Sequence, residues 1–151
     1  MVITCSDTRT PDTDTSGQLI QKLLKEQGHT VAAYHLVKDE PSKIKAKIKA
    51  AVTNKKIQAI IINGGTGISR RDSTFEAVDA MLEKRLDGFG EVFRNLTYQE
   101  IGSPAIMSRA TAGIIKGRVL FSTPGSENAV RLAMEKLILP ELGHLVKELT
   151  K

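Results

Sequence analysis

The chain has little that would support disulfide bonds or a membrane span. Its 151 residues include one cysteine, Cys5, and no tryptophan. Cys5 cannot form a disulfide within the chain, and we interpret it as a small buried strand residue. No segment has the length and apolar character of a membrane span, and none resembles a secretory signal. We therefore expect a protein of the reducing cytoplasm with no membrane partner.

Aromatic residues are also scarce. Two tyrosines and four phenylalanines leave few rings on which nucleic-acid bases could stack. The net charge of +5 and the isoelectric point of about 9.4 nevertheless favour an anionic partner. Much of the positive charge lies in the lysines of residues 43–56, which we interpret as the solvated face of a helix whose buried stripe includes Ile44 and Ile48. We expect a phosphorylated small molecule and no nucleic acid.

Several common catalytic motifs are absent. The chain has no Walker A sequence, no GxGxxG fingerprint and no GxSxG nucleophile elbow. Its three histidines are dispersed, without the spacing of metal ligands.

Alternating strand and helix patterns indicate one α/β domain over residues 1–151 with three layers and a doubly wound, mostly parallel sheet. The predicted strands are residues 2–5, 30–37, 57–62 and 118–122. The predicted helices are residues 14–28, a lysine-rich helix from Pro41, 73–84, the later part of 86–100 after an irregular turn, 103–110, and a segment from 127 to 149 that Pro140 interrupts or divides into two helices. A polar loop follows each predicted strand. Because ligands bind beyond the carboxyl ends of parallel strands, we expect loops 6–16, 38–41, 64–72 and 123–126 to share one rim.

The most informative stretch is the loop from Asn63 to Gly67, which contains three glycines. Glycine permits positive φ and lets a ligand approach backbone N–H groups, so the loop is suited to an anion. Ser73 and Glu76 have the spacing of a capping box, which predicts a helix that directs its positive end at the loop. The alternative interpretation is a tight turn that binds nothing.

Two acids, Asp39 and Asp72, should face the same rim. Two carboxylates beside a phosphate could hold Mg²⁺, although each acid could instead cap a helix. Ser126 and the amides after Gly125 could bind a second anion. Two anion sites on one rim would suit phosphoryl or nucleotidyl transfer.

An ordered set of motifs resembles the MoaB/MogA family of molybdenum cofactor biosynthesis. The matching residues are Ser6-Asp7-Thr8-Arg9, Asp14-Thr15-Ser16-Gly17, Gly64-Gly65-Thr66-Gly67 with Arg71-Asp72, Gly88-Phe89-Gly90-Glu91, Ser108-Arg109-Ala110 and Pro124-Gly125-Ser126. The stretch from Phe93 to Gly102 is more similar to the MoaB branch. Asn63 stands where the family usually has a threonine.

The resemblance implies a molybdopterin adenylyltransferase that uses Mg²⁺ and ATP, transfers AMP to the terminal phosphate of molybdopterin and releases pyrophosphate. By the same resemblance, Asp39 and Asp72 would be catalytic and could hold Mg²⁺. The residues expected to bind substrate or nucleotide are Ser6, Asp7, Gly64, Gly65, Thr66, Gly67, Arg71, Ser108, Arg109, Pro124, Gly125 and Ser126.

The resemblance also implies a homotrimer, or a hexamer formed from two trimers, and handover of product to a molybdate-inserting protein. Two alternatives stay open. One is a carrier or scaffold of the same fold that binds molybdopterin without turnover. The other is a nucleotide-responsive interaction module, which would bind ATP and no pterin.

Overall fold

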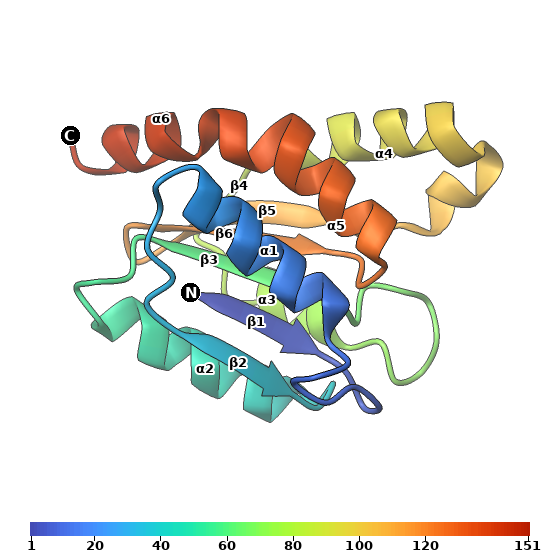
Figure 1. The fold of residues 1–151 in the computed structure, drawn as a ribbon, viewed down its shortest axis with the longest axis horizontal. Coiled ribbons are helices and arrows are strands. Elements are labelled where there is room, and N and C mark those ends of the chain that lie inside the picture. Colours follow the sequence, from blue (N-terminus) through green and yellow to red (C-terminus); the bar gives the residue numbers. More distant parts are fainter.

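A computed structural model describes residues 1–151, in which six strands form a single sheet (Figure 1). The strand order is β2-β1-β3-β6-β5-β4. The first four strands are parallel, and β5 is antiparallel to both of its neighbours, β6 and β4. The strands are β1 (Val2–Cys5), β2 (Tyr34–Val37), β3 (Ala59–Asn63), β4 (Lys84–Arg85), β5 (Thr111–Ile115) and β6 (Arg118–Thr123). The predicted α/β class and the mostly parallel sheet are confirmed.

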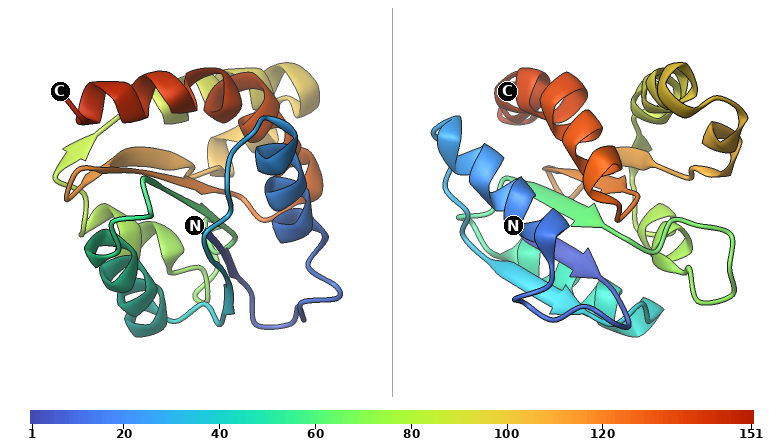
Figure 2. Two further views of the ribbon diagram at one scale, coloured as in Figure 1. Left: turned by 60° about the vertical axis from the view of Figure 1, so that its left-hand side comes forward. Right: turned by 45° about the vertical axis from the view of Figure 1, so that its right-hand side comes forward.

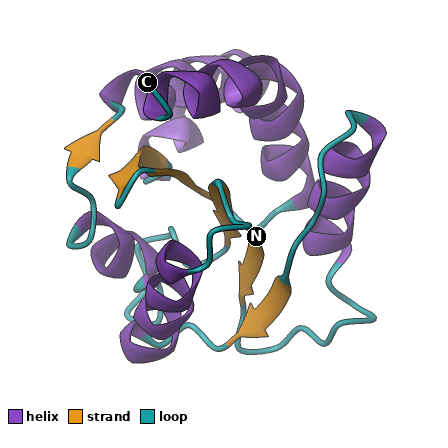
Figure 3. Ribbon diagram, turned by 90° about the vertical axis from the view of Figure 1, so that its left-hand side faces the viewer, coloured by secondary structure: helices purple, strands orange, loops and turns teal.

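Helices cover both faces of the sheet, so that the domain has three layers (Figures 2 and 3). One face carries α2 (Pro41–Thr53) and α3 (Thr74–Asp79). The other carries α1 (Thr15–Glu26), α4 (Asp87–Ile101), α5 (Glu127–Ala133) and α6 (Leu139–Leu149). None of these helices has the length and apolar character needed to cross a membrane.

The central strands alternate their side chains between two hydrophobic cores. In β3, Ile60 and Ile62 pack with α2 and α3, whereas Ile61 packs into the core beneath α1, α5 and α6. In β6, Leu120 packs in the core with α2 and α3, and Phe121 packs in the core beneath α1, α5 and α6. A strand covered on both faces needs apolar residues at every position, which explains the uninterrupted run in β3.

The hairpin formed by β5 and β6 was not expected from the sequence, which predicts a helix over residues 103–110. A short 3₁₀ turn, Ser103–Met107, occupies the first part, and β5 then pairs antiparallel with β6. The two strands are joined by Lys116 and Gly117, whose φ values of 46° and 72° belong to the tight turn that matches strand twist. Lysine rarely adopts positive φ, so this pair did not signal a hairpin.

The predicted helix of residues 73–84 is also wrong in its length and its cap. Helix α3 ends at Asp79, and the chain then turns into the edge strand β4, which pairs with β5. Ser73 is the residue before the helix but makes no side-chain cap bond, because its hydroxyl donates to Asp39 instead. Glu76 pairs with Arg109 and does not complete a capping box. Strand β2 is likewise shorter than predicted, since it begins at Tyr34.

Other predicted boundaries are confirmed. Asp14 caps α1 by accepting a hydrogen bond from the amide of Gly17, and Gly28 follows the helix with φ of 81°. Pro41 occupies the first turn of α2. The predicted interruption at Pro140 is wrong. A π-helical turn, Met134–Ile138, joins α5 to α6 without a break, and Pro140 lies in the first turn of α6.

The parallel strands place their carboxyl ends along one edge of the sheet. Strand β1 lies between β2 and β3, and the order of strands reverses at this point. The loops that follow β1, β2, β3 and β6 therefore meet at one rim, as predicted. This is the edge where open α/β sheets bind ligands.

Candidate functional site

A cavity of about 460 Å³ opens at the carboxyl edge of the sheet. One wall is apolar and comes from α4 and the turn after it, including Phe93, Ile101 and Met107. The opposite side is polar and comes from the rim loops. Ten of the predicted site residues line the cavity: Ser6, Gly64, Gly65, Thr66, Gly67, Asp72, Ser108, Pro124, Gly125 and Ser126. Asp7, Asp39, Arg71 and Arg109 do not line it.

The glycine loop turns sharply at Gly64 and Gly65, whose φ values are 100° and 68°. A side chain at Gly64 would collide with the backbone carbonyl of Cys5, and one at Gly65 with the hydroxyl of Thr74 and the carboxylate of Asp39. These glycines are therefore required by the packing of the protein itself. The loop keeps unpaired donors beside the cavity, because residues 65–67 line it and their backbone N–H groups donate to no protein acceptor.

Arg109 lies behind this loop and holds it in shape. Its Nε donates to the carbonyl of Thr66 at 3.1 Å, and Nη2 donates to the carbonyls of Gly67 and Asp72. Nη1 pairs with Glu76, and this hydrogen bond holds the pKa of the Glu76 carboxyl below its usual value. Arg109 thus binds backbone carbonyls of the loop, which leaves the loop's N–H groups for the cavity.

Asp72 is the one acidic side chain that lines the cavity. Its Oδ2 accepts hydrogen bonds from the amide and the hydroxyl of Ser69, at 3.0 and 2.5 Å. Its Oδ1 has no hydrogen-bond partner in the protein. Asp72 therefore closes the glycine loop with one oxygen and keeps the other available.

Asp39 lies behind the glycine loop and is only 7% exposed. Its Oδ1 accepts from the amide and hydroxyl of Ser73, at 3.1 and 2.7 Å, and from the hydroxyl of Thr74. It does not cap α2, the helix that follows it in sequence, because that helix begins after Glu40 without a side-chain cap. Asp39 instead joins the β2 loop to the start of α3.

Asp7 and Arg71 form a bidentate ion pair at the outer side of the rim. Nε and Nη2 of Arg71 each lie 2.8 Å from a carboxylate oxygen of Asp7. These hydrogen bonds lower the pKa of Asp7 and raise that of Arg71. Asp7 also accepts from the amide of Asp39. The pair links three rim loops, and neither residue reaches the cavity.

Some rim residues carry structural hydrogen bonds. The hydroxyl of Ser6 accepts from the amides of Thr8 and Arg9, which turns the chain after β1. Ser126 accepts from the amide of Ala129 at 3.2 Å and caps α5. Asn63, at the end of β3, donates to the hydroxyl of Thr4 at 2.9 Å and so connects β3 to β1.

Three residues of the first loop were missing from the predicted site. Arg9 lines the cavity, and its Nη2 donates to the carbonyl of Gly125 at 2.8 Å. Ser16 donates to the same carbonyl at 2.7 Å. Asp14 is fully buried, with its Oδ1 3.6 Å from Nη1 of Arg9. All three belong to the motif segments of the sequence, but periodicity and spacing could not show that Arg9 and Ser16 meet the turn after β6 or that Asp14 lies beside Arg9.

This chain is similar to known proteins over nearly its whole length. Residues 1–144 match the family described as "Probable molybdopterin binding domain". Molybdenum cofactor biosynthesis protein B of Bacillus subtilis is 54% identical over 151 residues, covering 99% of this chain and 89% of that protein. A crystal structure of a molybdenum cofactor biosynthesis protein B superposes with a TM-score of 0.96 at 53% identity, covering 99% and 93% of the two chains.

The chain belongs to the MoaB/MogA family. It is also similar to the tungsten cofactor synthesizing protein MoaB of Pyrococcus furiosus, with a TM-score of 0.87 and 38% identity over 99% and 95% of the two chains. The resemblance read from the motifs, including the MoaB branch, is therefore confirmed. A role in molybdenum cofactor biosynthesis follows from this membership.

Cys5 lies under the MoaB glycine loop as an unreactive residue. Its side chain is buried, and burial raises the pKa of the thiol to about 12. A thiol that stays protonated at neutral pH is a poor nucleophile. The interpretation of Cys5 as a buried strand residue is confirmed.

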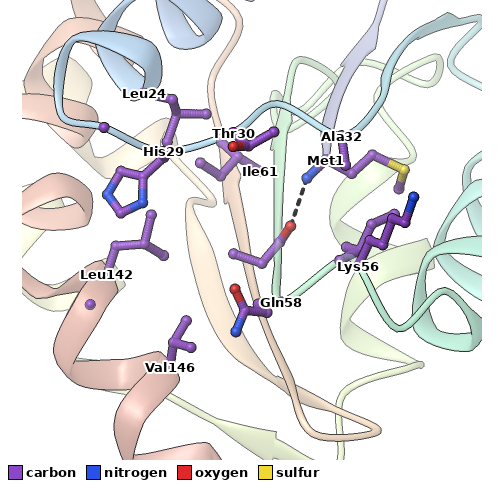
Figure 4. Close-up of a pocket in the computed structure, with 14 residues that line it drawn as sticks. Met1, Leu24, His29, Thr30, Ala32, Lys56, Gln58, Ile61, Leu142 and Val146 are labelled. Atoms are coloured by element: carbon purple, nitrogen blue, oxygen red, sulfur yellow. Dashed lines mark hydrogen bonds between the residues drawn. The ribbon is translucent and has the colours of Figure 1, made fainter.

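A second cavity of about 410 Å³ lies at the opposite edge of the sheet (Figure 4). Eight of its 14 lining residues are hydrophobic, including Leu24, Leu142 and Val146. The amino group of Met1 donates to the carbonyl of Ala59 at 2.8 Å beside it. None of the MoaB motif residues lies in this cavity, which separates it from the candidate site.

Proposed function

We propose that this protein catalyses the Mg²⁺- and ATP-dependent adenylylation of molybdopterin. In this reaction an oxygen of the terminal phosphate of molybdopterin attacks the α-phosphorus of ATP. The bond from the α-phosphorus to the oxygen that bridges to the β-phosphate breaks, and pyrophosphate leaves with that electron pair. The product is adenylylated molybdopterin, ready for molybdate insertion.

The residues that line the rim cavity support this proposal most strongly. Its polar side offers the unpaired backbone N–H groups of residues 65–67 together with Arg9, and these are donors for phosphate oxygens. Its apolar wall, which includes Phe93 and Met107, could take a flat heterocycle. Phosphoryl chemistry depends mainly on positioning and on charge neutralisation, and this arrangement supports both.

Mg²⁺ fits the chemistry of Asp72, whose Oδ1 has no hydrogen-bond partner and which lines the cavity. Oδ2 of Asp39 also has no hydrogen-bond partner, but it lies against Gly65 behind the loop, so Asp39 would reach the ion only if the loop moved. No group of three or more metal-binding side chains lies together in the structure, and Mg²⁺ commonly takes only one or two protein carboxylates with water and substrate phosphates. A bound Mg²⁺ ion would neutralise phosphate charge, and Asp72 would hold the ion at the cavity.

One observation favours the alternative of a carrier without turnover. Asp39, the second proposed catalytic acid, already accepts three hydrogen bonds from Ser73 and Thr74 and lies behind the loop. A protein that needs Asp39 only to shape the loop would bind molybdopterin and leave ATP intact.

We further propose that the protein assembles as a trimer or as a hexamer of two trimers. Tyr98, Ile101 and Ile106 are 60%, 58% and 83% exposed along α4 and the following turn, and contact with another copy would cover them. We propose a cytoplasmic location, where ATP is present, and handover of the product to a molybdate-inserting protein.

Two measurements on one preparation test the function: binding of molybdopterin, and release of pyrophosphate from ATP and Mg²⁺ when molybdopterin is added. The enzyme predicts both. Binding without pyrophosphate release would identify the carrier. Binding of ATP with no affinity for molybdopterin would identify the nucleotide-responsive module and contradict both other functions.

A further inference from the structure

The charged side chains of the rim divide into those that face the cavity and those that do not. Arg9 is the only cationic side chain that lines it, and Asp72 is the only acidic one. Arg71 is paired with Asp7 on the outer side of the rim, and Arg109 donates to the backbone of the glycine loop. The two arginines that the sequence predicts as ligand-binding groups are therefore occupied elsewhere, and Arg9 is left to meet an anion.

Arg9 retains most of its donors. Of its three guanidinium nitrogens, Nη2 donates to the carbonyl of Gly125, whereas Nε and Nη1 have no hydrogen-bond acceptor in the protein. The side chain is 29% exposed, so it is neither buried in the core nor free in solvent. With Nη2 bonded to Gly125 and Nη1 3.6 Å from Asp14, the guanidinium keeps hydrogen-bond donors on Nε and Nη1 that can bind a phosphate oxygen pair.

The buried carboxylate of Asp14 fixes the orientation of the Arg9 guanidinium. The side chain of Asp14 is fully buried, with Oδ1 accepting from the amide of Gly17 at 3.0 Å and Oδ2 from the hydroxyl of Tyr34 at 2.5 Å. Burial and the neighbouring Asp14 carboxylate both raise the pKa of Tyr34, which keeps its hydroxyl a donor. A buried carboxylate needs a cation, and Arg9 is the one beside it at 3.6 Å.

Gly17, the motif glycine next to Asp14, is required by close packing. A side chain on Gly17 would collide with the carboxylate of Asp14 and would lie 2.7 Å from the hydroxyl of Thr4. The carboxylate of Asp14 and the hydroxyl of Thr4 occupy the space beside Gly17, and the hydrogen bonds from Gly17 and Tyr34 hold the carboxylate next to Arg9. The position of the guanidinium is set by the fold before any ligand arrives.

We propose that Arg9 is the phosphate-binding cation of this cavity and that Asp14 is the residue that positions it. The ligand class is a phosphate ester or a pyrophosphate, held by Arg9 together with the free N–H groups of residues 65–67. This inference deepens the proposed function and rests on it for the identity of the ligand. It assigns to Arg9 the role that the sequence predicts for Arg71 and Arg109.

The test uses inorganic pyrophosphate as the probe, with titration calorimetry at fixed ionic strength and without metal. Arg9→Gln should weaken binding about tenfold or more, as expected for a lost charge-assisted bidentate contact. Arg131→Gln makes the same change of charge on the exposed surface of α5, where Arg131 pairs only with Glu135, and should change affinity less than about twofold. Arg9→Lys should recover part of the affinity. Wild-type affinity in Arg9→Gln would overturn the proposal.

The positioning role of Asp14 needs a double-mutant cycle, because a cap residue also supports the fold. Asp14→Asn keeps the size of the side chain and should weaken pyrophosphate binding in the wild-type background only. In the Arg9→Gln background the same change should have little further effect, since there is no guanidinium left to position. An equal loss in both backgrounds would overturn the role. If Asp14→Asn does not fold, Tyr34→Phe replaces it in the cycle, with the same two outcomes.

These results separate the inference from the proposed function. Pyrophosphate binding that depends on Arg9, in a protein that does not adenylylate molybdopterin, would leave the inference standing and remove the function. Adenylylation by Arg9→Gln with wild-type KM values for ATP and molybdopterin would remove the role of Arg9 and leave the proposed function standing.

Discussion

Nε of Arg109 donates a hydrogen bond to the backbone carbonyl of Thr66 across 3.1 Å, joining the start of β5 to the glycine loop. The same side chain also bonds the carbonyls of Gly67 and Asp72. An arginine placed in this way orders the loop from the side that faces away from the cavity. The residue therefore acts on the ligand through the loop, and its contribution should be visible in the ligand-free protein.

Arg109→Lys should loosen the glycine loop. Lysine cannot reproduce the planar fork, so several hydrogen bonds to the loop are lost and unfolding should become easier by about 2 kcal/mol. Urea denaturation measures that change, and hydrogen exchange should accelerate at the amides of Ser69, Asp72 and Thr74, which donate hydrogen bonds within and next to the loop. The matched control is Arg131→Lys on α5. Unchanged exchange in the loop would show that Arg109 does not order it.

Gly65→Ala should destabilise the protein more than Gly28→Ala. Both glycines have positive φ, 68° and 81°, so each substitution costs about 1 kcal/mol for the left-handed backbone. A side chain at Gly28 meets nothing within 4 Å, whereas one at Gly65 collides with Thr74 and Asp39. The extra collision should bring the cost at Gly65 to about 3 kcal/mol. Equal unfolding free energies for the two variants would contradict the packing role of Gly65.

The rim could be predicted because it follows from topology. Parallel strands place their carboxyl ends together, so polar loops after β1, β2, β3 and β6 had to meet whatever their detailed shapes. The apolar run in β3 likewise indicated a strand covered on both faces. Local patterns were sufficient for these features, since each depends on one segment and on a general rule of sheet geometry.

The individual roles of charged residues could not be predicted in the same way. Arg9, Arg71 and Arg109 all lie in motif segments and all pair with acids, and only the three-dimensional arrangement separates the one that lines the cavity from the two that do not. Asp39 is a similar case, because its partners Ser73 and Thr74 belong to a different loop. Pairings between residues distant in sequence leave no periodic signal.

The exposed apolar residues of α4 and the turn after it predict an oligomer. Light scattering should give the mass of three or six chains. Tyr98→Glu places a charge on this surface and should lower that mass, whereas Ala50→Glu, at an exposed position of α2, should not. A monomer mass for the wild-type protein would count against the assembly and would leave these apolar side chains exposed to water.

The proposed adenylylation is tested most directly by mass spectrometry of molybdopterin after incubation with the protein, ATP and Mg²⁺. Wild type, Asp72→Asn and Asp12→Asn are run in parallel. Asp72 lines the cavity, and Asn keeps its shape while removing its charge. Asp12 is exposed in the first loop, and Asp12→Asn makes the same chemical change there. We expect adenylylated molybdopterin from wild type and Asp12→Asn, and none from Asp72→Asn in a folded protein. Product from Asp72→Asn at the wild-type rate would remove the catalytic role of Asp72, and no product from wild type that binds molybdopterin would remove the adenylyltransferase function.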